Sequence, residues 1–143
     1  MKALRVGLFG FGKTGKLVAG EFIKDERFDL QWVVKRTKKF AENYASRLLG
    51  YETRTGAIHA VSKLGPRFFA KNPVDVLVDF SSSQGYRSYA AAADEGVKII
   101  TAISKYEAED LAALKAMAKK TAVLVSPNIT LGINFLLVAS QVL

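Results

Sequence analysis

The chain has 143 residues, which is enough for one domain with a core of ordinary size. Half of the residues are hydrophobic, but no apolar run approaches the roughly 20 residues that span a bilayer. The absence of cysteine excludes a disulfide framework and thiol catalysis, and no secretory segment is recognisable before the first apolar run. These features predict a cytoplasmic protein with no membrane partner.

The charge is strongly positive: 21 lysines and arginines face 13 acidic residues, giving a net charge of +8. Most of these charges are scattered, and the one dense cluster is K-R-T-K-K at 35–39. No series of base-stacking aromatic residues and no groove-entering motif accompanies the charge. We therefore expect an anionic small ligand rather than a nucleic acid.

Short apolar runs alternate with amphipathic segments, the pattern of an α/β fold in which a mainly parallel sheet carries helices on both faces. In chain order, strands are expected at 4–9, 30–34, 57–61, 74–80, 97–101 and 122–125. Helices are expected at 14–24, 40–49, 86–95 and 107–120, with a single helical turn at 66–72.

The last segment, INFLLVASQVL at 133–143, is nearly apolar on every side, and a helix of this kind must be buried against something. We expect residues 1–132 to form the domain and 133–143 to begin the connection into a missing carboxyl-terminal substrate domain. The alternatives are a contact with another subunit and a last core helix of the same domain.

A glycine-rich turn follows the first predicted strand, in the stretch LFGFGKTGKLV at 8–18. Gly10, Gly12 and Gly15 match the G-x-G-x-x-G spacing that joins a strand to a helix in dinucleotide-binding domains. The first glycine permits the tight turn, the second lets the backbone approach a pyrophosphate, and the third lets the helix pack closely on the strand. Together with the alternating strands and helices, this turn predicts a Rossmann-like, doubly wound fold.

The same stretch also matches the ATP-binding loop pattern G-x-x-x-x-G-K-S/T, starting from Gly7 and ending at Thr14. In such a loop the first glycine follows the end of the strand, whereas Gly7 lies within the apolar run 6–9. An ATPase is therefore the less favoured interpretation.

The end of the second predicted strand distinguishes between dinucleotides. An NAD site has Asp or Glu about 20 residues after the glycines, where the acid binds the ribose 2′-hydroxyl. This chain has Lys35, Arg36 and Thr37 there instead. Arginine and lysine pair with a 2′-phosphate through charge-assisted hydrogen bonds. The position favours NADP(H), with NAD(H) as a possible second cofactor.

Two later stretches, VDVLVDFSSSQGY at 74–86 and VLVSPNITLGINFLL at 123–137, closely resemble the amino-terminal domain of the dihydrodipicolinate reductase family. The family motifs are approximately D-V-x-I/V-D-F-T/S and A-P-N-F/Y-S-x-G-V/I-N, and the resemblance covers essentially the whole chain. There are two departures. The glycine turn is one residue shorter than in many members, and residues 101–104 are T-A-I-S where the family has G-T-T-G.

The resemblance implies that the turn after 74–80 contacts the nicotinamide half of the cofactor, with the next strand end beside it. The loop after the last strand would meet both the cofactor and the substrate domain. The cofactor-binding residues expected from the glycine turn, the basic cluster and the resemblance are Gly10, Phe11, Gly12, Lys13, Thr14, Gly15, Lys35, Arg36, Thr37, Phe80, Ser81, Ser82, Thr101, Ala102, Ser126, Pro127, Asn128 and Ile129.

The resemblance further implies hydride transfer from NAD(P)H to a cyclic unsaturated dicarboxylate, in the diaminopimelate route to lysine. In the family, the proton donor and the carboxylate-binding groups lie in a carboxyl-terminal domain with a His-rich motif, a Lys and a Ser-Gly-Thr stretch. None of these motifs occurs in this chain, whose single histidine, His59, is expected to be incidental. Neither Lys105 nor Tyr106 has a visible catalytic partner.

We therefore expect no catalytic residue and no metal site in this chain, and no turnover by the chain alone. The dicarboxylate substrate would be bound through the missing domain, and the full-length protein is expected to be a homo-oligomer. A stand-alone NADP-binding regulatory module remains the alternative from another functional class.

Overall fold

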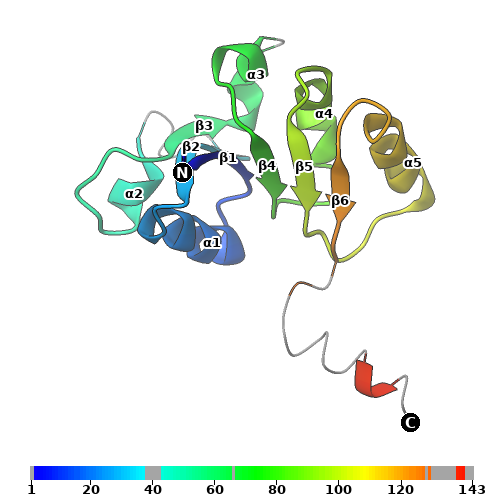
Figure 1. Cartoon of the computed structure of the whole chain (residues 1–143), viewed down its shortest axis with the longest axis horizontal. Helices are drawn as coiled ribbons and strands as arrows, with labels where there is room; N and C mark the ends of the chain where they lie inside the picture. The colour runs from blue at the N-terminus through cyan, green and yellow to red at the C-terminus, as the bar shows by residue number, and fades with distance from the viewer. Residues whose placement is uncertain (1, 38–42, 66, 128, 130–137, 141–143) are drawn as a thin grey trace.

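The computed structural model describes residues 2–37, 43–65, 67–127, 129 and 138–140. Its six strands are all parallel and form one sheet in the order β3-β2-β1-β4-β5-β6 (Figure 1). The predicted fold class is confirmed. The strands are β1 (Leu4–Phe9), β2 (Phe28–Lys35), β3 (Ala57–Ala60), β4 (Val76–Asp79), β5 (Lys98–Thr101) and β6 (Val123–Val125).

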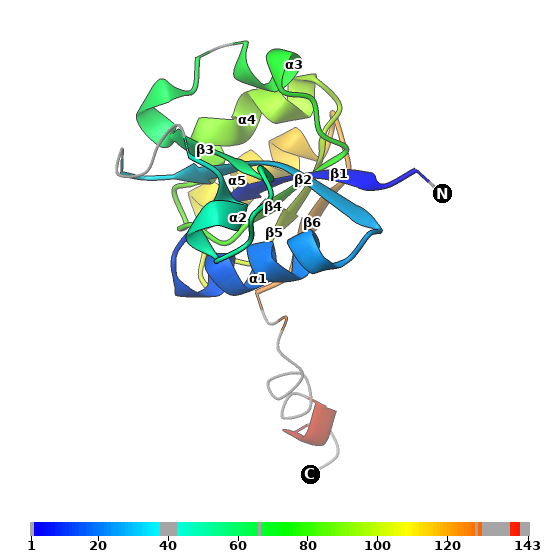
Figure 2. The same cartoon turned by 90° about the vertical axis from the view of Figure 1, so that its left-hand side faces the viewer.

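Helices cover both faces of the sheet. Figure 2 shows α1 and α2 on one side and α3 and α4 on the other. The helices are α1 (Lys13–Lys24), α2 (Ala45–Leu48), α3 (Phe68–Lys71), α4 (Tyr86–Asp94) and α5 (Ala108–Met117), with a 3₁₀ turn η1 (Val61–Lys63).

Each face of the sheet has its own apolar core, because central parallel strands are buried on both sides. All four residues of β4 are buried. On the α1 face, Val6, Leu8 and Val33 pack with Ala19 of α1. The opposite core is built largely from aromatic and aliphatic side chains of several elements: Phe9, Trp32, Phe68, Phe69, Tyr86, Tyr89, Leu114 and Met117.

Gly7 lies in the middle of β1, where it makes room for the largest buried side chain. A Cβ atom added to Gly7 would lie 2.2 Å from the ring of Trp32, which is itself only 1 % exposed. The indole Nε1 of Trp32 donates a hydrogen bond to the carbonyl of Asn72 at 3.0 Å. Gly7 therefore belongs to the strand and the core, so Gly7 to Thr14 do not form the continuous phosphate loop of an ATPase.

Several predicted boundaries were wrong. β2 extends beyond the expected 30–34 at both ends, and it includes the polar Asp29, whose side chain is exposed. Of the predicted helix 40–49, the described residues 43–49 are helical only at 45–48. Residues 40–42 lie outside the described residues, and Tyr44 is extended and bridges to Ala57.

The apolar segment 133–143 lies mostly outside the described residues. Residues 138–140 form a helical turn, in which Val138 is exposed. The proposed division at residue 132 therefore stays a prediction. In the part of the chain that the structure describes, no helix combines the length and the apolar character needed to cross a membrane.

Candidate functional site

The strand order reverses at β1 and β4: β2 and β3 follow on one side of β1, whereas β4, β5 and β6 follow on the other. Open α/β sheets bind ligands at such a switch point, outside the carboxyl ends of the strands. Backbone hydrogen bonds continue past the strand ends and hold the following turns in place. The Gly10 amide donates to the Val34 carbonyl at 2.9 Å, and the Phe80 amide donates to the Phe9 carbonyl at 2.8 Å. The three strand ends β1, β2 and β4 are thereby tied together beside the glycine turn.

The three glycines of the turn have distinct geometries. Gly10 has φ +91°, and a Cβ atom there would lie 2.6 Å from the backbone of Phe80. A Cβ atom on Gly15 would lie 2.0 Å from the Gly10 carbonyl oxygen, so this glycine lets helix α1 pack against the turn. By contrast, a Cβ atom on Gly12 meets nothing within 4 Å. Gly12 therefore leaves open space directly before α1.

Helix α1 begins beside this open space, with Gly12 as its N-cap and no side chain capping it. The first backbone hydrogen bond of the helix joins the Lys16 amide to the Gly12 carbonyl at 3.0 Å. Earlier amides at a helix start have no partner within the helix, and they carry the positive end of its dipole. This arrangement suits a phosphate group.

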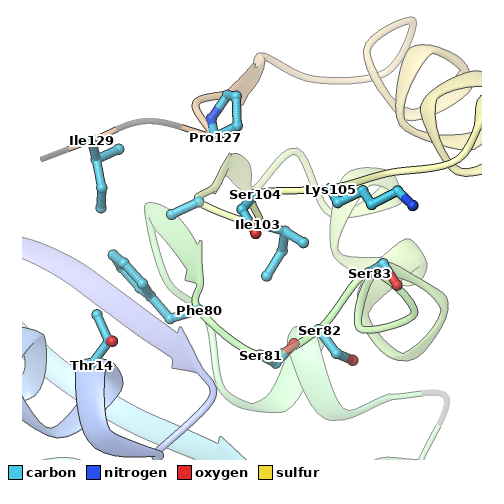
Figure 3. A pocket seen from close by; sticks show the side chains of 11 residues that line it. Thr14, Phe80, Ser81, Ser82, Ser83, Ile103, Ser104, Lys105, Pro127 and Ile129 are labelled. Carbon is cyan, nitrogen blue, oxygen red and sulfur yellow. The ribbon is translucent and has the colours of Figure 1, made fainter. Parts of the chain in front are cut away.

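A cavity of about 510 Å³ lies on one side of the turn, at the carboxyl ends of β4, β5 and β6 (Figure 3). Figure 3 shows Phe80 and Ile129 pointing toward one another across it, while Lys105 extends away. The cavity is lined by hydroxyl and apolar groups from four separate segments: Thr14, Phe80, Ser81, Ser82, Ser83, Ala102, Ile103, Ser104, Lys105, Pro127 and Ile129.

A smaller cavity of about 170 Å³ lies on the other side, between the glycine turn and the end of β2. It is lined by Phe9, Gly10, Val34, Lys35, Arg36, Val61, Ser81, Ser82, Gln84, Gly85 and Ser88. Ser81 and Ser82 line both cavities, so the two spaces flank the same turn after β4. Lys35 and Arg36 contribute positive charge to the lining of the smaller cavity.

Some predicted site residues lie elsewhere. The side chain of Phe11 is buried in the core on the α1 face. Thr101 is also buried, and its hydroxyl is 2.5 Å from that of Tyr106. Thr37 is exposed beyond the end of β2, and Asn128 lies outside the described residues.

Ten of the predicted residues line one or both cavities: Gly10, Thr14, Lys35, Arg36, Phe80, Ser81, Ser82, Ala102, Pro127 and Ile129. Lys13 is exposed in the first turn of α1. The amide of Ser126 donates to the Thr101 carbonyl at 2.8 Å, which extends the β5–β6 pairing to the residue before Pro127. These placements leave the assignment of cofactor contacts a prediction.

The sequence of the chain matches a known protein family. The family model described as dihydrodipicolinate reductase, N-terminus, matches residues 4–129. The chain belongs to this family. The described residues that follow β4 and β6 in its two motif stretches, Phe80 to Ser83 together with Pro127 and Ile129, line the larger cavity.

Relatives in the dihydrodipicolinate reductase family are longer than this chain. A 4-hydroxy-tetrahydrodipicolinate reductase from Archaeoglobus fulgidus is 32 % identical over 55 % of this chain and 32 % of its own length. The corresponding enzyme from Buchnera aphidicola subsp. Acyrthosiphon pisum is 24 % identical over 94 % of this chain and 49 % of its own length. The chain thus spans about half the length of these relatives, or less.

Solved structures with a similar fold include proteins of other families. GenD2 from gentamicin A biosynthesis, solved in complex with NAD, has a TM-score of 0.66 at 16 % identity, over 88 % of this chain and 35 % of that one. A Rex-family repressor, RSP, has a TM-score of 0.64 at 14 % identity, over 99 % of this chain and 59 % of that one. At these identities the likeness shows the fold alone.

Sequence reasoning missed the polar side chains that hold the turn after β4 of this family member. Asp79, the last residue of β4, is fully buried, and Tyr89 of α4 donates to its Oδ2 at 2.9 Å. Burial raises the pKa of Asp79. The signal was present in the V-D-F-S motif, but the partner ten residues later could not be recognised from spacing alone.

Of the remaining candidates, His59 lines neither cavity, whereas Lys105 lines the larger one. His59 lies in β3, its ring contacts that of Phe68 with centroids 5.0 Å apart, and burial lowers its pKa. Lys105 forms an ion pair with Glu107 at 3.3 Å, with both side chains largely exposed. Within the described residues, no group of three or more His, Cys, Asp or Glu side chains is arranged to hold a metal ion.

Proposed function

We propose that this chain is the NADP(H)-binding domain of an oxidoreductase that reduces a cyclic, unsaturated dicarboxylate. The observation that carries the proposal is the position of Lys35 and Arg36 in the same cavity as Gly10. In a Rossmann-like domain the end of β2 meets the adenosine ribose, and basic residues there favour a 2′-phosphate over a free hydroxyl.

The residues present fit a dinucleotide. The open space at Gly12, before the uncapped start of α1, accepts the pyrophosphate between the two cavities. The smaller cavity then takes the adenosine end, and the larger one takes the nicotinamide, which supplies the hydride when bound. Phe80 and Ile129 would shield the nicotinamide from water, and the serines of the turn after β4 would fix its orientation.

The substrate and the remaining chemistry would come from protein beyond this chain. The relatives named as reductases are at least about twice as long as the part that aligns. We propose that their additional segment binds the substrate carboxylates and donates the proton, so that this chain binds cofactor without turnover.

Isothermal titration of the chain with NADPH, NADH and ATP tests the proposal. We expect NADPH to bind more tightly than NADH, and ATP to bind much more weakly than either. Tight binding of ATP without binding of NADPH would overturn the dinucleotide assignment. Equal affinity for NADPH and NADH would retain the fold-based assignment but overturn the preference for the 2′-phosphate.

A further inference from the structure

The turn after β4 is built around one buried carboxylate. Oδ1 of Asp79 accepts two hydrogen bonds from Ser81, one from its backbone amide at 2.7 Å and one from its hydroxyl at 2.6 Å. Oδ2 accepts the hydroxyl of Tyr89 at 2.9 Å. The amide proton and the hydroxyl proton of Ser81 are therefore both donated to Asp79.

The surroundings keep Ser81 in this geometry. A Cβ atom on Gly85 would lie 2.2 Å from Ser81 Oγ and 3.1 Å from Asp79 Oδ2, so the turn closes tightly over the carboxylate. The Gly85 amide donates to the Ser82 carbonyl at 2.9 Å, which closes the turn. Tyr89 is fully buried in α4, and its position is thus fixed by the core.

The other groups near the carboxylate are hydroxyls and an acid that is itself paired. The Tyr106 hydroxyl, on the loop after β5, is 2.5 Å from Thr101 Oγ1. Asp110 of α5 accepts Gln84 Nε2 at 3.2 Å and the Glu107 amide at 3.1 Å. Among the described residues, the Ser81 hydroxyl donates to Asp79 and not to any of these groups.

A hydroxyl that donates its only proton retains two acceptor lone pairs. Ser81 is exposed and lines both cavities, so these lone pairs are available to a ligand. The Ser81 hydroxyl can therefore accept a hydrogen bond from a ligand, but it has no further proton to donate. A ligand carbonyl or carboxylate gains nothing from Ser81, whereas a ligand N–H does.

We propose that Asp79 is a positioning residue that makes Ser81 a dedicated acceptor for the primary amide N–H of the nicotinamide carboxamide. This inference rests on the proposed dinucleotide function and adds the group of the cofactor that the turn recognises. Asp79 acts through Ser81 and does not touch the ligand itself.

The test compares NADP⁺ with its 3-acetylpyridine analogue, in which a methyl ketone replaces the carboxamide and removes its N–H donors. Wild-type protein is expected to bind NADP⁺ roughly two- to tenfold more tightly than the analogue, the range for one neutral hydrogen bond. Ser81→Ala is expected to lose this discrimination by binding NADP⁺ more weakly. Ser82→Ala is the matched comparison and changes both affinities by the same factor.

Substitutions of Asp79 test its role separately. Asp79→Asn keeps an acceptor oxygen toward Ser81 and is expected to retain the discrimination, whereas Asp79→Ala is expected to lose it. Circular dichroism establishes folding of each variant, and if Asp79→Ala does not fold, Ser81→Ala still decides whether Ser81 accepts the amide.

The outcomes separate the two proposals. Discrimination that survives Ser81→Ala, or that is absent from the wild type, overturns this inference while leaving dinucleotide binding in place. Discrimination that survives in folded Asp79→Ala overturns the role of Asp79. A wild-type chain that binds neither NADP⁺ nor the analogue overturns the proposed function as well.

Discussion

The two sides of the glycine turn offer different chemical groups to a ligand. On the β2 side, a cavity of about 170 Å³ carries Lys35 and the exposed Arg36. On the other side, a cavity of about 510 Å³ is lined by serines and apolar groups above the buried Asp79. Exposed charges discriminate by net charge and are screened by salt, whereas a buried hydrogen-bonded group fixes donor and acceptor geometry.

The two sides differ in how well they should tolerate substitutions. Arg36 and its neighbours extend from the end of a strand, and their replacement need not disturb the core. Asp79 is tied to both Ser81 and Tyr89, so a change there affects the turn and helix α4 together. We expect cofactor preference to be readily altered on the first side and constrained on the second.

Gly10→Ala is the substitution expected to disrupt the cavities on both sides of the glycine turn. It places a side chain at φ +91° and a Cβ atom 2.6 Å from the Phe80 backbone, where the turns of β1 and β4 meet. We expect the free energy of unfolding to fall by about 2–5 kcal/mol, from left-handed strain and overpacking. Urea denaturation measures this change, and titration with NADPH should show no binding.

Gly12→Ala is the matched control, because its Cβ atom meets no protein atom within 4 Å. This variant should unfold near the wild-type urea concentration but bind the dinucleotide more weakly, since the methyl group projects into the proposed pyrophosphate space. Equal loss of stability in the two variants would contradict the geometric difference between these glycines.

Arg36→Asp changes only the β2 side. We expect NADPH affinity to fall by roughly 10- to 100-fold, because a charge-assisted hydrogen bond is lost and a like charge is introduced. NADH affinity should change little, and the wild-type preference for NADPH should shrink at high salt. Isothermal titration with both cofactors at two salt concentrations measures this. A parallel decrease for NADPH and NADH would show that Arg36 does not read the 2′-phosphate.

The sequence was sufficient to predict the parallel sheet and the helices that cover it. Alternating apolar runs set the order of strands and helices, and the glycine spacing located the turn before α1. Boundaries were less accurate where polar residues are exposed within a strand, as at Asp29, or where an extended residue precedes a short helix, as at Tyr44.

The buried network could not be predicted in the same way. Asp79 stands at the end of an apolar run, and its partners Ser81 and Tyr89 come from a turn and from the inner face of a helix. Periodicity says which face of α4 is buried, but it does not say which buried tyrosine aims its hydroxyl at a carboxylate. Pairings of this kind depend on side-chain directions in the folded protein.

Asp79, which lies below the larger cavity, should also make the free energy of unfolding depend on pH. Burial raises the pKa of Asp79 in the folded protein, so between its ordinary pKa and the raised value the folded state holds a proton that the unfolded state has lost. The free energy of unfolding therefore falls as the pH rises through this interval. Asp79→Asn cannot ionise and should lack this decrease.

Urea denaturation of the wild type and Asp79→Asn at a series of acidic pH values measures the difference. The variant should gain stability relative to the wild type as the pH rises through the interval. Parallel stability curves would mean that Asp79 does not titrate differently in the folded and unfolded states.

The smallest effect is expected at Asp75, beside the opposite edge of the same sheet. Its carboxylate accepts Arg5 Nη2 at 2.7 Å, Nε at 3.2 Å and the backbone amide at 2.9 Å, and hydrogen bonding to Arg5 lowers the pKa of Asp75 to about 2. Because both side chains are about one third exposed, Asp75→Asn should reduce stability by no more than about 1 kcal/mol at neutral pH.

The sign of the pH dependence is opposite to that of Asp79. The stabilisation from Asp75 is complete above its ordinary pKa and is lost as the pH falls toward 2, so the gap between wild type and Asp75→Asn should narrow between pH 7 and pH 3. Dinucleotide affinity should stay unchanged, since Asp75 lies at the amino end of β4. A loss of NADPH affinity in Asp75→Asn would contradict this expectation. It would show that a change at the amino end of β4 alters the two cavities at its carboxyl end.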